Sequence, residues 1–145
     1  MANVFDVAAY ILDRQGPMSA MKLQKLVYYA QAWSLVWDDA PLFPNRIEAW
    51  ANGPVVRDLY EVHCGQYQVN ASLFRPHAEG GLNATQIETI DTVLGFYANH
   101  SAQWLSDQTH AEDPWRLARE GLADRERGER EITLAALAEY YGALD

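Results

Sequence analysis

KLQKLVYYAQAW, residues 22–33, is the centre of the stretch that decides the fold. Ser19 is a good N-cap, and the residues after it predict a helix over residues 19–37. Tyr28 and Leu35 lie on roughly the opposite side of this helix from its main apolar face. A helix that is apolar on more than one face has neighbours on several sides, so we expect it to be the axis of the fold. The main face consists of Leu23, Leu26, Val27, Ala30, Trp33 and Trp37.

A tight Asn-Gly-Pro turn at residues 52–54 follows, within the segment IEAWANGPVVRDLY at residues 47–60. Before the turn, residues 46–50 alternate in character and predict at most a minor short β element. After it, Pro54 suits the first position of a helix, where a missing N–H costs nothing. The sequence therefore predicts a helix from Pro54 to about His63.

The rest of the chain predicts shorter helices joined by irregular segments. Thr85 and Glu88 fit a capping box, and Asp113 can cap a helix that begins with a proline. Residues 65–82 are rich in turn residues and predict a long connection, with a short strand near residues 72–75. The predicted helices lie at residues 3–15, from Thr85 to about Asn99, and after Ser101, Asp113 and Thr133.

The composition indicates one compact domain over residues 1–145, a mainly α helical bundle around the helix at 19–37. Apolar residues make up 49% of the chain and aromatic residues 12%, which favours a globular protein over a disordered one. Cys64 is the only cysteine, so no disulfide within the chain is possible and a reducing, cytoplasmic location is expected. No apolar run reaches the roughly 18–20 residues of a membrane helix, so no membrane partner is expected.

The net charge of −9 is distributed unevenly. Residues 1–75 are close to neutral, whereas residues 76–145 hold five arginines against thirteen acidic residues. An acidic surface repels phosphate backbones, so direct nucleic-acid binding is not expected. Lys22 and Lys25 are the only lysines. We expect their stems to cover apolar surface while their charges stay in water, with a contact to a partner as the alternative.

Candidate chemistry is sparse. The four histidines form no pair at helical i, i+4 spacing, and no HExxH or CxxC motif occurs, so neither a metal site nor a cofactor is expected. His110 with Glu112 or Asp113 is the one candidate acid–base group. Because no nucleophile or oxyanion-hole signature accompanies it, we expect instead that His110 caps the preceding helix, with Trp115 packed beneath its ring.

Several strings, taken in order, resemble one family. They are KLQKLVYYA at residues 22–30, EAWANGPV at residues 48–55 and LSDQTHAEDPW at residues 105–115, followed by a closing element with Ile132, Leu137 and Tyr140. On these residues the chain is similar to the SocA-like antitoxin domain, which is also called Panacea and is linked to the phage-associated protein GepA.

The resemblance implies a mainly helical domain that acts by binding and brings no catalytic residues with it. Its members look like antitoxins of two-gene modules that bind a toxin protein directly, and one delivers its toxin to a protease. We therefore expect a cognate toxin as the partner. A protease adaptor or phage-derived regulatory subunit is the alternative, and a small hydrolase using His110 is a further one.

Three residues are the expected contacts to this partner: Arg57, Tyr60 and Tyr67. They follow the turn or lie in the long connection, where a surface can vary without disturbing the core.

Overall fold

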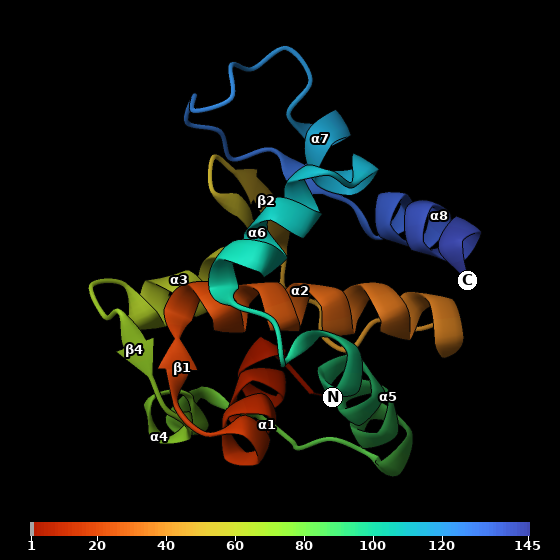
Figure 1. Ribbon diagram of the computed structural model, residues 1–145. Coiled ribbons are helices and arrows are strands. Elements are labelled where there is room, and N and C mark those ends of the chain that lie inside the picture. Colours follow the sequence, from red (N-terminus) through yellow and green to blue (C-terminus); the bar gives the residue numbers. More distant parts are fainter. Residues whose placement is uncertain (1) are drawn as a thin grey trace.

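The computed structural model describes residues 2–145 and is mainly helical, with a few short strands. The helices are α1 (Val4–Gln15), α2 (Ala20–Trp37), α3 (Arg57–His63), α4 (Ala71–Phe74), α5 (Ala84–Tyr97), α6 (Ala102–His110), α7 (Asp113–Ala118) and α8 (Leu134–Leu144), with a 3₁₀ turn at Arg75–His77. The strands are β1 (Met18–Ser19), β2 (Ile47–Trp50), β3 (Gly53–Val56), β4 (Gln68–Val69) and β5 (Glu131–Ile132). In Figure 1, α1, α4 and α5 lie below α2, whereas β2, α6 and α7 lie above it.

The helix α2 is the axis of the core, as the sequence predicts. It packs against α1, α5, α6 and α8 and also against β3. Tyr28 and Tyr29 are both buried, because neighbours cover α2 on more than one side. The hydrophobic core extends from Val4 in α1 to Tyr141 in α8. Within residues 2–145, no helix combines the length and the hydropathy needed to cross a membrane.

The predicted helix after the Asn-Gly-Pro turn is present as α3 and ends at His63 as predicted, but it begins at Arg57 and not at Pro54, because residues 53–56 form the strand β3. β2 and β3 form an antiparallel hairpin in which Ala49 faces Pro54, and β5 pairs with the other side of β2. Pro54 is tolerated because β3 is an edge strand. The side-chain amide of Gln24 in α2 completes the pairing: its Oε1 accepts from the N–H of Val56 at 2.9 Å and its Nε2 donates to the Val56 carbonyl at 3.2 Å.

Of the other local predictions, some are confirmed and some are wrong. The side-chain caps predicted at Ser19, Ser101 and Thr133 are all present. The capping box at the start of α5 uses Asn83 and Gln86 instead of Thr85 and Glu88. Asp113 is the first residue of α7 and not its cap. Residues 72–75 are helical, and the strand of this region is β4, which pairs with β1.

The irregular connections are fixed by hydrogen bonds from single side chains. The Asp6 carboxylate accepts from the backbone N–H groups of Asn3, Glu79 and Gly81, and so ties the loop before α5 to the start of α1.

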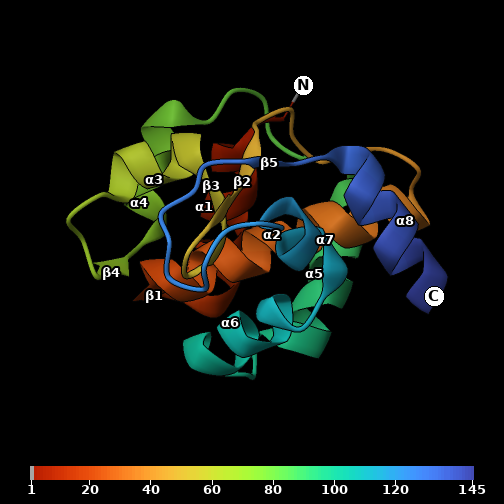
Figure 2. The ribbon, with the colours of Figure 1, turned by 90° about the horizontal axis from the view of Figure 1, so that it is seen from above.

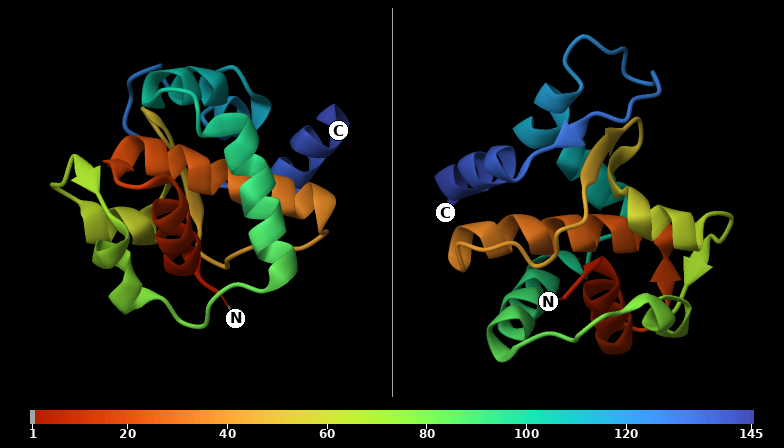
Figure 3. Two further views of the ribbon diagram at one scale, coloured as in Figure 1. Left: turned by 60° about the horizontal axis from the view of Figure 1, so that its bottom comes forward. Right: turned by 180° about the vertical axis from the view of Figure 1, so that it is seen from behind.

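The loop between α7 and β5 passes beside the hairpin when the molecule is seen from above (Figure 2). The crossing of α2 by α5 is visible in the left view of Figure 3.

Candidate functional site

The first turns of α2 and the β2–β3 hairpin border a pocket of about 340 Å³. α3 forms one further wall, and the loop between α7 and β5 forms another. The pocket is lined by Ala20, Met21, Gln24, Lys25, Trp50, Ala51, Asn52, Val55, Tyr60, His63, Arg125, Arg127, Gly128 and Glu129.

Lys25 is buried at this pocket, so the expectation that its charge stays in water is wrong. Only 2% of the surface of Lys25 is exposed. Within residues 2–145 the one hydrogen bond of its ammonium group is to the Pro54 carbonyl, at a long 3.5 Å. Burial lowers the pKa of Lys25 from 10.5 to about 8. At pH 7 the site therefore still holds a cation, with little inside the chain to balance it.

Gly53 is the residue that lets the hairpin close over Lys25. Its φ of +127° is one that L side chains rarely adopt. A Cβ at this position would lie 2.6 Å from Cε and 3.1 Å from Nζ of Lys25. The position of Lys25 beneath the turn therefore requires a glycine at residue 53.

The hairpin is held against α6 and α7 by three side chains that donate to its carbonyl groups. Ser106 Oγ donates to the Asn52 carbonyl at 2.8 Å, and Trp115 Nε1 donates to the Trp50 carbonyl at 2.8 Å. The buried guanidinium of Arg119 donates to the Ala49 carbonyl at 3.1 Å. The LSDQTHAEDPW string thus serves to position the hairpin, which forms one wall of the pocket.

His110 does not pair with a carboxylate. Its ring stacks on the Trp115 ring, with centroids 4.0 Å apart and planes 10° apart, as the sequence suggests for these two residues. Burial lowers the pKa of His110, and the charge of Lys25 acts in the same direction. Within the described part of the chain, His110 Nε2 is buried without a hydrogen-bond partner.

Glu112 and Asp113, the two carboxylates considered for His110, are engaged elsewhere. Asp113 accepts from Arg116 at 2.8 Å. Glu112 has 5% exposure, and its Oε1 accepts from the hydroxyls of Tyr29 at 2.7 Å and Tyr141 at 2.8 Å. The position of this glutamate at the centre of a buried network could not be predicted from sequence, because its partners come from α2 and α8. No three His, Cys, Asp or Glu side chains of residues 2–145 gather as ligands for a metal ion.

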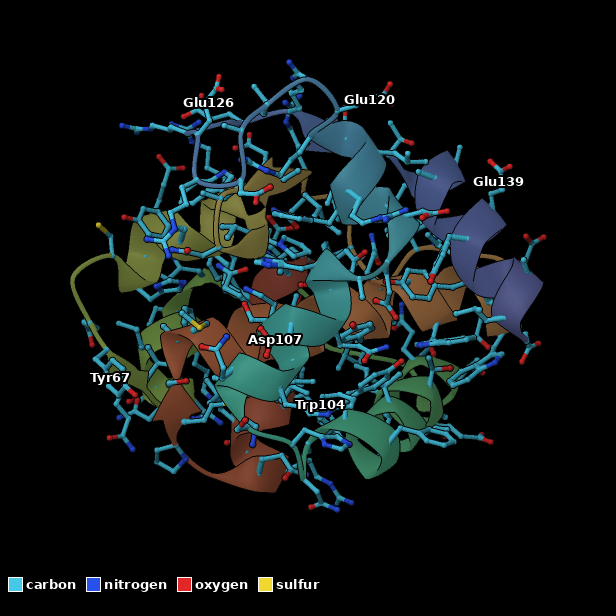
Figure 4. All side chains as sticks on the ribbon, turned by 45° about the horizontal axis from the view of Figure 1, so that its top comes forward. Tyr67, Trp104, Asp107, Glu120, Glu126 and Glu139 are labelled. Atoms are coloured by element: carbon cyan, nitrogen blue, oxygen red, sulfur yellow. The ribbon has the colours of Figure 1, made fainter. Side chains whose placement is uncertain are left out.

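The three expected contact residues lie on two parts of the surface. Tyr60 is in the pocket wall, where its ring meets Trp50 edge to face with centroids 4.8 Å apart. Arg57 is on the same helix and pairs with Glu129 at 3.3 Å. Tyr67 is 85% exposed and lies outside the pocket lining, at the margin of the molecule in Figure 4. Its carbonyl accepts from the N–H of Ala20 at 2.8 Å, which keeps it beside the first turn of α2.

Gly53→Ala should lower the free energy of unfolding by about 2 kcal/mol, through backbone strain and the collision with Lys25. Gly65→Ala is the matched control, because Gly65 also has positive φ, at +86°, but a Cβ there would meet nothing within 4 Å. We expect the control to cost about 1 kcal/mol. Urea unfolding of both variants measures the difference. Equal losses would mean that Lys25 moves aside freely.

One known family matches the part of the chain that contains the hairpin. The family model described as "Antitoxin SocA-like, Panacea domain" matches residues 23–116. This range starts in α2 and ends in α7, and it contains Lys25, the whole hairpin and Trp115. Neither a curated protein nor a solved structure matches the chain. The chain belongs to the family of SocA-like antitoxins that carry the Panacea domain.

Proposed function

We propose that this protein is a non-catalytic antitoxin that neutralises a cognate toxin by binding it directly. The family supports an antitoxin role. The observation that carries the proposal is the structural role of the sequence segments that resemble the family. These segments form the hairpin and hold it in place, and the candidate acid–base residues are engaged in structural contacts. Cys64 is exposed and free, which suits the reducing cytoplasm where we expect the protein to act.

The toxin-binding surface proposed here surrounds the first turn of α2. Tyr67 and Met21 expose 85% and 42% of their surface there, and Tyr60 lies in the wall of the neighbouring pocket. Exposed aromatic side chains of this kind supply much of the affinity of protein interfaces. Arg57, on the same helix as Tyr60, adds a charged group at the edge of this surface.

Co-expression with the product of the adjacent gene tests the proposal. We expect the two proteins to co-purify and the growth defect caused by the partner alone to disappear. Tyr67→Ala should weaken the complex at least about tenfold, because it removes the most exposed aromatic side chain of the proposed contact surface. Phe96→Ala is the matched control, since Phe96 is 68% exposed but belongs to α5, and it should leave the affinity unchanged.

Two results would contradict this function. If the proteins neither co-purify nor suppress a growth defect, the antitoxin role is wrong. If the partner is degraded more slowly once this protein is deleted, the protein acts as a protease adaptor and not as a stoichiometric inhibitor.

A further inference from the structure

We infer that the pocket at Lys25 receives the carboxylate of an acidic side chain from the toxin, which forms an ion pair with the Lys25 ammonium. The inference rests on the proposed function, because the occupant is a residue of the protein partner. It adds to that function the site of the strongest contact and the chemistry of the group that fills it.

Lys25 is under-coordinated. An ammonium group has three N–H donors, and within residues 2–145 this one has a single acceptor, the Pro54 carbonyl at 3.5 Å. The residue is almost fully buried and lines the pocket at the same time. A buried charge is stable only when it is paired, so a group that enters the pocket and offers oxygen acceptors would gain a strong interaction.

The charges around the pocket are mostly positive. Arg125 and Arg127 line it together with Lys25. The one acid in the lining, Glu129, is paired with Arg57 at 3.3 Å. The pocket is therefore locally cationic in a chain of net charge −9. Such a site favours an anionic group, and the acidic remainder of the surface would disfavour approach in other orientations.

The remaining walls of the pocket are apolar and aromatic. Met21, Ala51 and Val55 contribute apolar surface, and Trp50 and Tyr60 contribute aromatic rings. An aliphatic stem that ends in a carboxylate matches this lining better than a bare inorganic anion does. Glutamate and aspartate side chains have this form, and an anchor in a pocket beside exposed aromatic residues is typical of interface hot spots.

The pocket can be tested on this protein alone with butyrate, which reproduces a glutamate side chain together with its Cα. Butyramide has the same shape without the charge. In a titration followed by amide NMR shifts, butyrate should move the signals of Gly53 and Gln24 with a Kd in roughly the millimolar range, at least about tenfold tighter than butyramide. Equal effects of the two compounds would overturn the inference.

The second arm measures the complex by calorimetry, using the protein encoded by the adjacent gene as the probe. Lys25→Met should weaken binding at least about tenfold, because the carboxylate of the toxin would be buried without its partner. Lys22→Met is the matched control and should bind like the wild type, since Lys22 Nζ is occupied by the Ala98 carbonyl at 2.7 Å. Thermal unfolding confirms that both variants are folded.

The two proposals fail in different ways. If the wild type does not bind the neighbouring protein, the proposed function is wrong. If the wild type binds it and Lys25→Met binds equally well, the function stands and the pocket is not the carboxylate site. If Lys25→Met does not fold, the comparison of butyrate with butyramide on the wild type decides.

Discussion

Glu112→Ala should lower the free energy of unfolding by about 3 kcal/mol or more, which is a large part of the stability of a domain of this size. The carboxylate is the common acceptor for the hydroxyls of Tyr29 and Tyr141, at 2.7 Å and 2.8 Å, and Gln108 donates to its other oxygen at 3.2 Å. Both tyrosines are fully buried. Removing the carboxylate leaves two phenol groups without this acceptor in the core and opens a cavity between α2, α7 and α8.

Two further variants separate this network from a general effect of losing a carboxylate. Glu139→Ala removes an exposed glutamate from α8, at the far edge of the molecule from Tyr67 in Figure 4, and should change stability by less than about 0.5 kcal/mol. Glu112→Gln keeps one oxygen acceptor and the shape, so it should cost about half as much as the alanine variant. Urea unfolding measures all three. If Glu112→Ala matches Glu139→Ala, the tyrosine hydroxyls find other acceptors and the network does not stabilise the core.

The features of the fold that were predictable from sequence are those fixed within one turn of helix. Ser19, Ser101 and Thr133 cap their helices through hydroxyl groups that reach the backbone three residues ahead. Pro54 follows the same local rules for a helix start, yet it lies in a strand. The reason is long-range: β2 occupies one side of β3, and the amide of Gln24 in α2 occupies both polar groups of Val56.

In the candidate site, too, the features that depend on long-range contacts were not predictable. Tyr60 could be placed near a surface because it follows a turn, and it does line the pocket. The burial of Lys25 was not predictable from its helix alone, because Lys22 is three residues away on the same helix and differs in donating to the Ala98 carbonyl. What separates the two lysines is the hairpin, which folds over only one of them. The buried network of Glu112 was not predictable for a similar reason, since its tyrosine partners are far away in sequence.

Lys25→Met should raise the free energy of unfolding at pH 7 by about 2 kcal/mol, because it replaces a poorly paired buried charge with an apolar side chain of similar length. The wild type should show the same cost as a dependence on pH. Burial lowers the pKa of Lys25 in the folded protein to about 8, against 10.5 for an exposed lysine. Between these values the unfolded chain binds the proton that the folded chain has lost, so stability rises with pH, by roughly 1 kcal/mol from pH 7 to pH 9.

The other titratable groups around Lys25 contribute little to the change in stability over this pH range. His63 in α3 and His110 in α6 have lowered pKa values, chiefly through burial, so both are already neutral at pH 7. Unfolded tyrosines, with a pKa near 10, are about a tenth ionised at pH 9, so the window ends at that pH. Urea unfolding at pH 7, 8 and 9 should therefore show a rise for the wild type and for Lys22→Met, and none for Lys25→Met. A flat profile for the wild type would mean that the folded protein already pairs the Lys25 charge, which would leave the ammonium group with no unmet demand for a partner's carboxylate.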